Sequence, residues 1–156
     1  MKPQSVTIQN LEAAFAGESM AHIKYRYFAK LARAADDEAT ARIFEETADQ
    51  EVQHAFGHLD LLYPKADLSP ARALEIAIEG ETYEYTEMYP KFRHLAVEEG
   101  NSAAVAELDQ QIVESKEHAR SFRRTLEKAA KRFAALAKVE ERHANQYKAA
   151  LAKVQH

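Results

Sequence analysis

The chain has 156 residues, of which 46% are hydrophobic and 29% charged, with a formal net charge of −4 and no cysteine. This length and composition are typical of one globular domain, and the acidic balance gives no electrostatic basis for binding nucleic acid or an anionic membrane. The absence of cysteine excludes disulfides, thiolate zinc sites, Cys-ligated iron–sulfur centres and a cysteine nucleophile. Any metal must therefore be bound by oxygen and imidazole ligands, which suit iron, manganese or zinc.

The composition also predicts a helical protein. Glycine and proline together number eight, while the best helix formers dominate. No stretch approaches 18 apolar residues, and the N-terminus lacks a basic-then-apolar signal pattern. We therefore expect a cytoplasmic, all-α protein.

Two helices are predicted in the first part of the chain. The first begins near Thr7, a plausible N-cap, and runs to about Ala35. Asp36 and Asp37 end it and cap the second, which runs to Tyr63 before a proline. Each has an inward-facing stripe at the helical spacing of three and four. The stripes are Leu11, Phe15, Glu18, His22, Tyr25, Phe28 or Ala29, and Ala32, and then Phe44, Ala48, Glu51, His54 or Ala55, His58, and Leu61 or Leu62.

A third helix is predicted between Ser69-Pro70, an N-cap followed by proline at the first helical position, and Gly100-Asn101. Pro90 lies inside it, removes one backbone hydrogen bond to the carbonyl of Thr86, and should kink the helix. Its expected stripe is Ala73, Ala77, Glu84, Glu87, Lys91 and Leu95.

From Ser102 to the end no glycine or proline interrupts the chain. Apolar residues hold a seven-residue register, which predicts either one long helix of roughly 80 Å or two helices joined by a turn that the sequence does not signal. The two rows of this register are Val105, Ile112, Ala119, Leu126, Phe133, Glu140, Tyr147 and Val154, and Leu108, Ser115, Phe122, Ala129, Leu136, His143 and Ala150.

This last segment resembles itself at a shift of 25 residues. His118-Ala119 corresponds to His143-Ala144 and Phe122 to Tyr147. Twenty-five residues are close to seven helical turns, so such an insertion preserves the facing of every residue after it. We interpret residues 103–125 as a degenerate duplication of the last helix.

Ionisable residues occupy stripe positions where leucine or phenylalanine is expected. A lone carboxylate facing a core costs several kcal/mol, whereas five carboxylates and two imidazoles converging from four helices are explained by two bound divalent cations. The predicted metal ligands are Glu18, Glu51, His54, Glu84, Glu87, Glu140 and His143.

Glu-x-x-His places both side chains on one helical face, where they can bind the same ion. Two such pairs and a glutamate from each other helix form the di-iron bundle pattern. Glu51 and Glu140 would bridge, and the other glutamates would be terminal or bridging. Each motif alone is weak, and the acidic positions from Glu81 to Glu87 could be a solvated face. The remaining stripe histidines are interpreted as core residues or as residues beside the ligands, and Tyr25 as packing or as a partner that hydrogen-bonds a ligand or scavenges a radical.

At these residues the sequence resembles the rubrerythrin family, specifically short erythrin-type members without a rubredoxin-like tail. The resemblance covers nearly all of residues 8–100 and 126–152. The matching segments are Gly17-Glu18-Ser19-Met20-Ala21, Tyr25-Arg26-Tyr27-Phe28-Ala29, Glu51-Val52-Gln53-His54-Ala55, Gly80 to Pro90 and Ala137 to His143.

The resemblance implies a single ferritin-like domain over residues 1–156, an all-α four-helix bundle with an extended or duplicated last helix. It implies two iron ions as cofactor, with manganese or zinc as substitutes, and reduction of hydrogen peroxide to water. Glu87 is implied to exchange with His54 as the iron changes oxidation state, and Tyr25 is placed with them as catalytic. The alternatives are a ferroxidase or oxidase, and a ferritin-like protein that stores or carries iron.

Two departures from the family matter. Its full-length members relay electrons through a four-cysteine rubredoxin-like site, so here an external donor, such as a separate rubredoxin-like protein, is expected. The family also lacks the 25-residue insertion, and Ser115 stands where uninterrupted spacing would put a glutamate ligand. We therefore assign the site to Glu140 and His143 and not to the first copy with His118.

The insertion also has a geometric consequence. A hairpin at Gly100 brings Glu84 level with residue 115 or 116, and Glu140 lies about 37 Å further along a continuous helix. The favoured prediction is a homodimer in which residues 126–156 are exchanged between chains. The alternative is a break near residues 123–128, with a fifth helix and a monomeric bundle.

Overall fold

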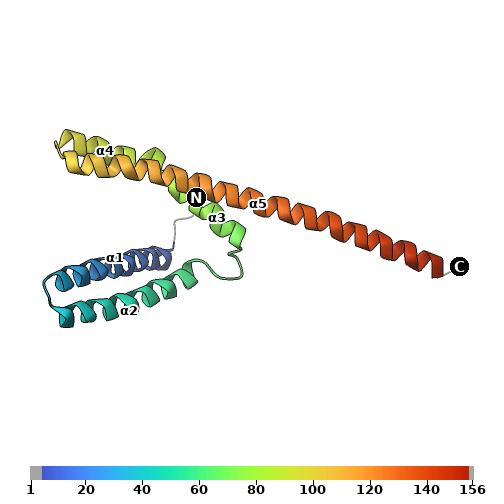
Figure 1. The fold of residues 1–156 in the computed structure, drawn as a ribbon, viewed down its shortest axis with the longest axis horizontal. Helices are drawn as coiled ribbons and strands as arrows, with labels where there is room; N and C mark the ends of the chain where they lie inside the picture. The colour runs from blue at the N-terminus through green and yellow to red at the C-terminus, as the bar shows by residue number, and fades with distance from the viewer. Residues whose placement is uncertain (1–4, 155–156) are drawn as a thin grey trace. The chain divides into compact units, whose positions relative to one another are not determined.

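The computed structural model describes residues 5–154, and all of its regular secondary structure within them is helical, as predicted (Figure 1). The elements are α1 (Val6–Ala34), α2 (Glu38–Leu62), α3 (Pro70–Tyr83), the π-helical turn η1 (Glu84–Met88), α4 (Tyr89–Glu98) and α5 (Ser102–Val154). Across these described residues, none of the helices combines the length and hydropathy needed to span a membrane. The chain divides into two compact units, the first ending at Leu68 and the second beginning at Ser69.

The first unit is a hairpin of α1 and α2. Small side chains allow the two helices to approach closely, and the most buried residues are Ala29, Ala41, Ala48 and Ala55, at 0–4% exposed. The ring of Phe44 contacts Phe28, with centroids 5.5 Å apart. All of these residues except Ala41 belong to the predicted stripes, so the inward faces of both helices are confirmed, and the buried face of α2 begins one turn earlier than predicted.

The ends of α1 and α2 follow the sequence signals in part. The Asp37 side chain caps α2 by accepting a 3.0 Å hydrogen bond from the Thr40 amide, as predicted. The Thr7 cap was wrong, because α1 begins at Val6 with Ser5 in the cap position, and that side chain makes no cap hydrogen bond.

The second unit packs the continuous helical segment α3–η1–α4 against the first half of α5. Ser69 caps α3 by accepting from the Arg72 amide, which confirms the Ser-Pro start. Gly100 lies between α4 and α5 with a φ of +71°, a left-handed conformation that glycine adopts without strain. Ser115 and Ala119 of α5 are buried in the resulting interface.

The backbone before Pro90 departs from a regular α-helix. The backbone forms a π-helical turn just before it, in which the Tyr89 amide donates to the Glu84 carbonyl. The wider turn changes the facing of the residues around it. After the turn, Ala96 is buried, whereas Lys91 and Leu95 are exposed. Glu87 in the turn and Ala73 near the start of α3 are also exposed, so the predicted stripe was wrong at these four positions.

α5 is a single helix, so the two-helix alternative and the break near residues 123–128 were wrong. Its heptad stripe is buried or half-buried from Val105 to Ala129. Beyond that point Phe133 and Leu136 are 70% and 58% exposed. Figure 1 shows this half of α5 extending past the start of α3. The extended last helix is thus confirmed, and its apolar stripe continues where no helix of this unit covers it.

Candidate metal centre

The first unit brings three of the predicted ligands together. Glu18 comes from α1, and Glu51 and His54 lie one turn apart on the same face of α2. One ligand atom from each of the three residues lies within 4.8 Å of the other two. The hairpin register and the Glu-x-x-His spacing therefore create this group, as the sequence predicts.

The donor set of this group fits a divalent transition metal. Carboxylates and imidazole are ligands for iron, manganese and zinc, and these ligand atoms, all within 4.8 Å of one another, could reach a common ion with small side-chain movements. His54 Nδ1 lies 3.0 Å from Glu51 Oε2. The Glu51 side chain is 16% exposed and that of His54 is 60% exposed, so the group opens to the surface on the His54 side.

The electrostatics of the group show two carboxylates in competition. A hydrogen bond with Glu51 raises the pKa of Glu18, and desolvation and the Glu51 charge add to this. The pKa of Glu51 is lowered, first by Glu18 and then by His54. Of the two carboxylates, Glu18 is thus the one that takes up a proton more readily, and a cation would relieve the repulsion between them when both are ionised.

Two residues beside the group have structural contacts. His22 Nδ1 donates to the Ala48 carbonyl at 2.7 Å, which ties α1 to α2 next to Glu51. The ring of Tyr25, predicted as catalytic, packs against Phe44 with centroids 5.9 Å apart. Tyr25 is half-buried on the same face of α1 as Glu18.

A second polar cluster lies inside the second unit. Ser115, 3% exposed, donates a 2.9 Å hydrogen bond to Glu84 Oε2. His118 Nδ1 lies 3.3 Å from Glu81 Oε1. Within the part of the chain that the structure describes, Glu81 Oε2 is buried without a hydrogen-bond partner. An orphaned carboxylate oxygen fits a cation or a donor at this position.

Desolvation raises the pKa of Tyr89, and the charges of Glu84, Glu81 and Glu107 raise it further. The charges of these three glutamates thus act on Tyr89 inside the interface of α3–η1–α4 with α5.

The other predicted ligands are not gathered by this unit. Glu87 lies on η1 and is exposed. Glu140 and His143 are exposed on the uncovered half of α5. Since Ser115 is level with Glu84, Glu140 lies 25 residues further along the same helix, roughly 37 Å away.

Sequence reasoning missed the part that Glu81 plays. Glu81 was not among the predicted ligands and was considered only as part of a possible solvated acidic face, yet its side chain is 22% exposed and pairs with His118. The three-residue spacing of Glu81, Glu84 and Glu87 was the available signal, because residues at this spacing lie near one another on one side of a regular helix. The π turn, which no residue pattern specified, decides which of these glutamates faces α5.

These features define a class of protein, an all-α protein with a Glu-x-x-His carboxylate site on a helical hairpin. The family model for rubrerythrin matches residues 9–126, about three-quarters of the chain. The chain belongs to the rubrerythrin family. Its fold is accordingly of the ferritin-like four-helix class, and the family binds a di-iron centre.

Individual relatives support the assignment. Nigerythrin of Nitratidesulfovibrio vulgaris is 40% identical over 111 residues, covering 64% of this chain and 55% of the relative. Rubrerythrin of Porphyromonas gingivalis is 36% identical over 129 residues, covering 76% and 64%. The chain thus spans between half and two-thirds of the length of these relatives. A solved structure of fully reduced, all-ferrous nigerythrin is 34% identical, with a TM-score of 0.41, and the match covers 83% of this chain and 70% of that chain.

The matched range differs from the predicted resemblance in one respect. It includes the first copy of the duplicated helix, with Ser115 and His118, and ends at residue 126. The assignment of Glu140 and His143 therefore stays a prediction.

Proposed function

We propose that this protein is a non-haem di-iron peroxidase that reduces hydrogen peroxide to water in oxidative-stress defence. The observation that carries the proposal is the Glu18–Glu51–His54 group on the hairpin that matches the rubrerythrin family. When bound, two iron ions would supply the electrons that cleave the O–O bond. In balance, one peroxide takes up two electrons and two protons and yields two waters.

The residues of the chain have distinct roles in this proposal. Glu18 and Glu51 neutralise the cations, and the contact between Glu51 and His54 sets the orientation of the imidazole. His54 and Glu87 are both exposed, and we propose that these two alternate in coordination between oxidation states. Tyr25 is proposed to hydrogen-bond a ligand or to quench a radical beside the centre. The full ligand set adds Glu84, Glu140 and His143.

The electrons are proposed to come from a separate protein. The 156 residues contain no cysteine, so a four-cysteine iron site cannot form within them. A rubredoxin-like donor is the proposed partner, and hydrogen peroxide the proposed substrate.

Stopped-flow oxidation of the reduced, iron-loaded protein tests the activity. Peroxide is expected to oxidise the centre much faster than dioxygen at equal concentration. Faster oxidation by dioxygen would favour the ferroxidase or oxidase alternative. Iron that shows no redox change with either oxidant would favour storage or transport.

Metal analysis tests the ligands. His54→Ala and Glu140→Ala should each lose bound metal, whereas His118→Ala should lose little. If His118→Ala loses as much metal as His143→Ala, the ligands would instead lie in the first copy. Anomalous scattering at the iron and zinc edges would identify the metals.

A further inference from the structure

Ser115 is the one polar residue that is buried among the residues that the structure describes, at 3% exposed. It lies on α5 in the interface with α3–η1–α4, where the other buried residues among those described are Ala96 and Ala119. Alanine suits such a position in a close-packed interface and has a higher helix propensity than serine. Packing and helix propensity therefore do not account for the hydroxyl of Ser115.

The hydroxyl of Ser115 bonds across this interface and not along its own helix. Serine and threonine inside helices commonly donate to the carbonyl four residues earlier. Thr47 and Thr125 do so, at 2.8 and 3.0 Å. The Ser115 hydroxyl instead donates to Glu84 Oε2, at 2.9 Å, and so joins residues 31 positions apart in the chain. This hydrogen bond fixes the Glu84 carboxylate relative to α5.

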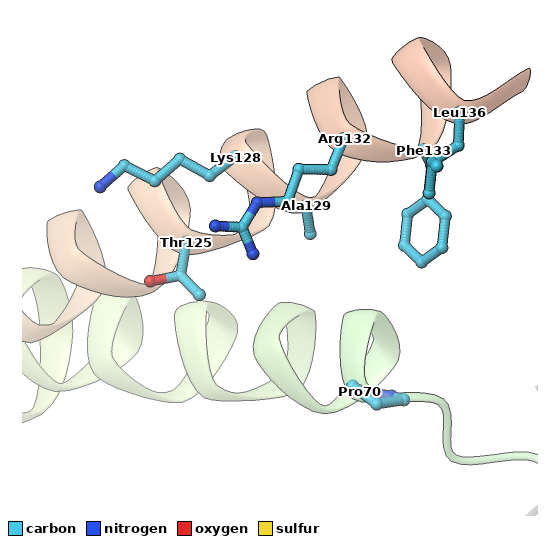
Figure 2. A pocket seen from close by; sticks show the side chains of 7 residues that line it. All are labelled: Pro70, Thr125, Lys128, Ala129, Arg132, Phe133 and Leu136. Atoms are coloured by element: carbon cyan, nitrogen blue, oxygen red, sulfur yellow. The ribbon is translucent and has the colours of Figure 1, made fainter. Parts of the chain in front are cut away.

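Within the part of the chain that the structure describes, Ser115 holds one oxygen of Glu84, whereas Oε1 makes no hydrogen bond and the carboxylate forms no ion pair. The basic side chains of α5 lie elsewhere. Arg123 donates to the hydroxyl of Thr82. Figure 2 shows Arg132 at the apolar groove near Pro70, about four helical turns before Glu84. A half-buried carboxylate with one neutral donor and no counter-ion is suited to bind a cation through its free oxygen.

We propose that Ser115 is a positioning residue for the metal centre, which holds Oε2 of Glu84 so that Glu84 binds one cation as a terminal ligand through Oε1. The inference rests on the proposed di-iron function, and it chooses between the terminal and bridging roles that the sequence left open for this glutamate. A bridging carboxylate gives each oxygen to a different ion, whereas Ser115 already occupies one of the two oxygens. Groups that hydrogen-bond a metal ligand orient it, and their loss typically costs about 10–100-fold in metal affinity.

Removal of the hydroxyl should weaken metal binding. Ser115→Ala is expected to bind zinc, a redox-inert probe, about 10–100-fold more weakly than the wild type in competition with a coloured chelator. Ser121→Ala, on the exposed side of α5, should bind zinc as the wild type does. Unchanged affinity of Ser115→Ala would overturn the inference and leave the proposed function standing. A wild type that binds neither zinc nor iron would contradict the proposed function, and this inference with it.

A matched pair of variants separates the hydroxyl from its effect on packing. Ser115→Thr and Ser115→Val introduce side chains of nearly the same size and shape, of which only threonine keeps a hydroxyl donor. We expect Ser115→Thr to bind zinc about tenfold or more tighter than Ser115→Val. Circular dichroism checks that both variants fold. Equal zinc affinities in the folded pair would contradict a role for the hydroxyl.

A double-mutant cycle shows whether Ser115 acts through Glu84. In a Glu84→Gln background the carboxylate ligand is already lost, so adding Ser115→Ala should cause no further loss of zinc affinity. The same loss in both backgrounds would mean that Ser115 affects the site through the fold alone, and the proposal would be wrong.

Infrared spectroscopy of the zinc-loaded protein tests the binding mode. The antisymmetric and symmetric carboxylate stretching bands lie further apart when a carboxylate binds through one oxygen than when it bridges two ions. The bands that disappear in Glu84→Gln should show the wide separation in the wild type and a narrower one in Ser115→Ala. A narrow separation for Glu84 in the wild type would show a bridging ligand and overturn the proposal.

Discussion

At the scale of single residues, the carboxylates of Glu18 and Glu51 lie close enough on the hairpin to change each other's pKa. The hydrogen bond between Glu18 and Glu51 raises the pKa of Glu18 and lowers that of Glu51, so Glu18 is the carboxylate of the pair that takes up a proton more readily. A bound cation would favour the ionised form of both, so the ionised Glu18 that would help to bind metal costs stability in the metal-free protein.

Glu18→Gln should therefore stabilise the metal-free protein and weaken metal binding. Because the folded pKa of Glu18 is raised, its contribution to stability is present at low pH and is lost as the pH rises through that value. Glutamine donates the same hydrogen bond without ionising. Urea unfolding should show a more stable variant at pH 7 and no difference well below pH 4.5, the ordinary Glu value. Glu46→Gln, exposed on the same hairpin, is the control; an equal gain there would show a nonspecific charge effect.

Ser115 shows how the second unit satisfies a carboxylate in its interface. It is almost fully buried, and its hydroxyl donates to Glu84. Ser115→Ala should lower the free energy of unfolding of the metal-free protein by about 1–2 kcal/mol, because the half-buried carboxylate loses its donor. Ser121→Ala, on the exposed side of the same helix, should change it by less than about 0.5 kcal/mol. Equal effects in a denaturant titration would mean that the Ser115 hydrogen bond adds nothing to stability.

At the scale of elements, the turn between α4 and α5 sets the register that places Ser115 beside Glu84. Gly100 has a positive φ, whereas Gly80 lies in the interior of α3 with open space around its Cα. Gly100→Ala should destabilise the protein by about 1 kcal/mol because alanine is strained in the left-handed region. Gly80→Ala should stabilise it by about 0.5–1 kcal/mol through helix propensity. Thermal unfolding measures both, and effects of the same sign would contradict these assignments.

The π turn η1 is the element with the largest consequence for the site. Both Glu84 and Glu87 belong to this turn, and Glu84 is half-buried whereas Glu87 is exposed. In a regular helix, residues three apart share a face, so the turn gives each glutamate a different environment. In the proposed function, Glu84 would remain bound to the metal, and Glu87 would change its coordination.

At the scale of the whole molecule, stability should depend on metal content. Ions that bind the folded state stabilise it by mass action, and their removal leaves glutamates crowded in poorly solvated positions. A chelator should lower the melting temperature clearly at pH 7, and less at pH 5, where carboxylates can protonate. Scanning calorimetry with and without chelator measures this. An unchanged melting temperature would mean that the glutamates do not bind metal in the folded protein.

Much of the architecture is set by local chemistry that is readable in the chain. Asp37, Ser69 and Gly100 end or begin helices because their side chain or backbone suits a helix terminus, and each does so in the structure. The stripes of α1 and α2 were predictable for the same reason, since helical spacing decides which residues share a face. The group of Glu18, Glu51 and His54 then arises from one hairpin.

Other features depend on contacts that no local pattern encodes. The heptad stripe of α5 predicts an apolar face along the whole helix, but only the packing of α3–η1–α4 decides that coverage stops near Ala129. The π turn likewise shifts the facing of Glu87 and Leu95, because its wider backbone turn rotates the residues that follow relative to those before it. Residue spacing alone thus placed the carboxylates and imidazoles of the candidate metal site on shared helix faces. Tertiary packing decided which of them meet, because side chains far apart in sequence approach only where whole helices are brought together.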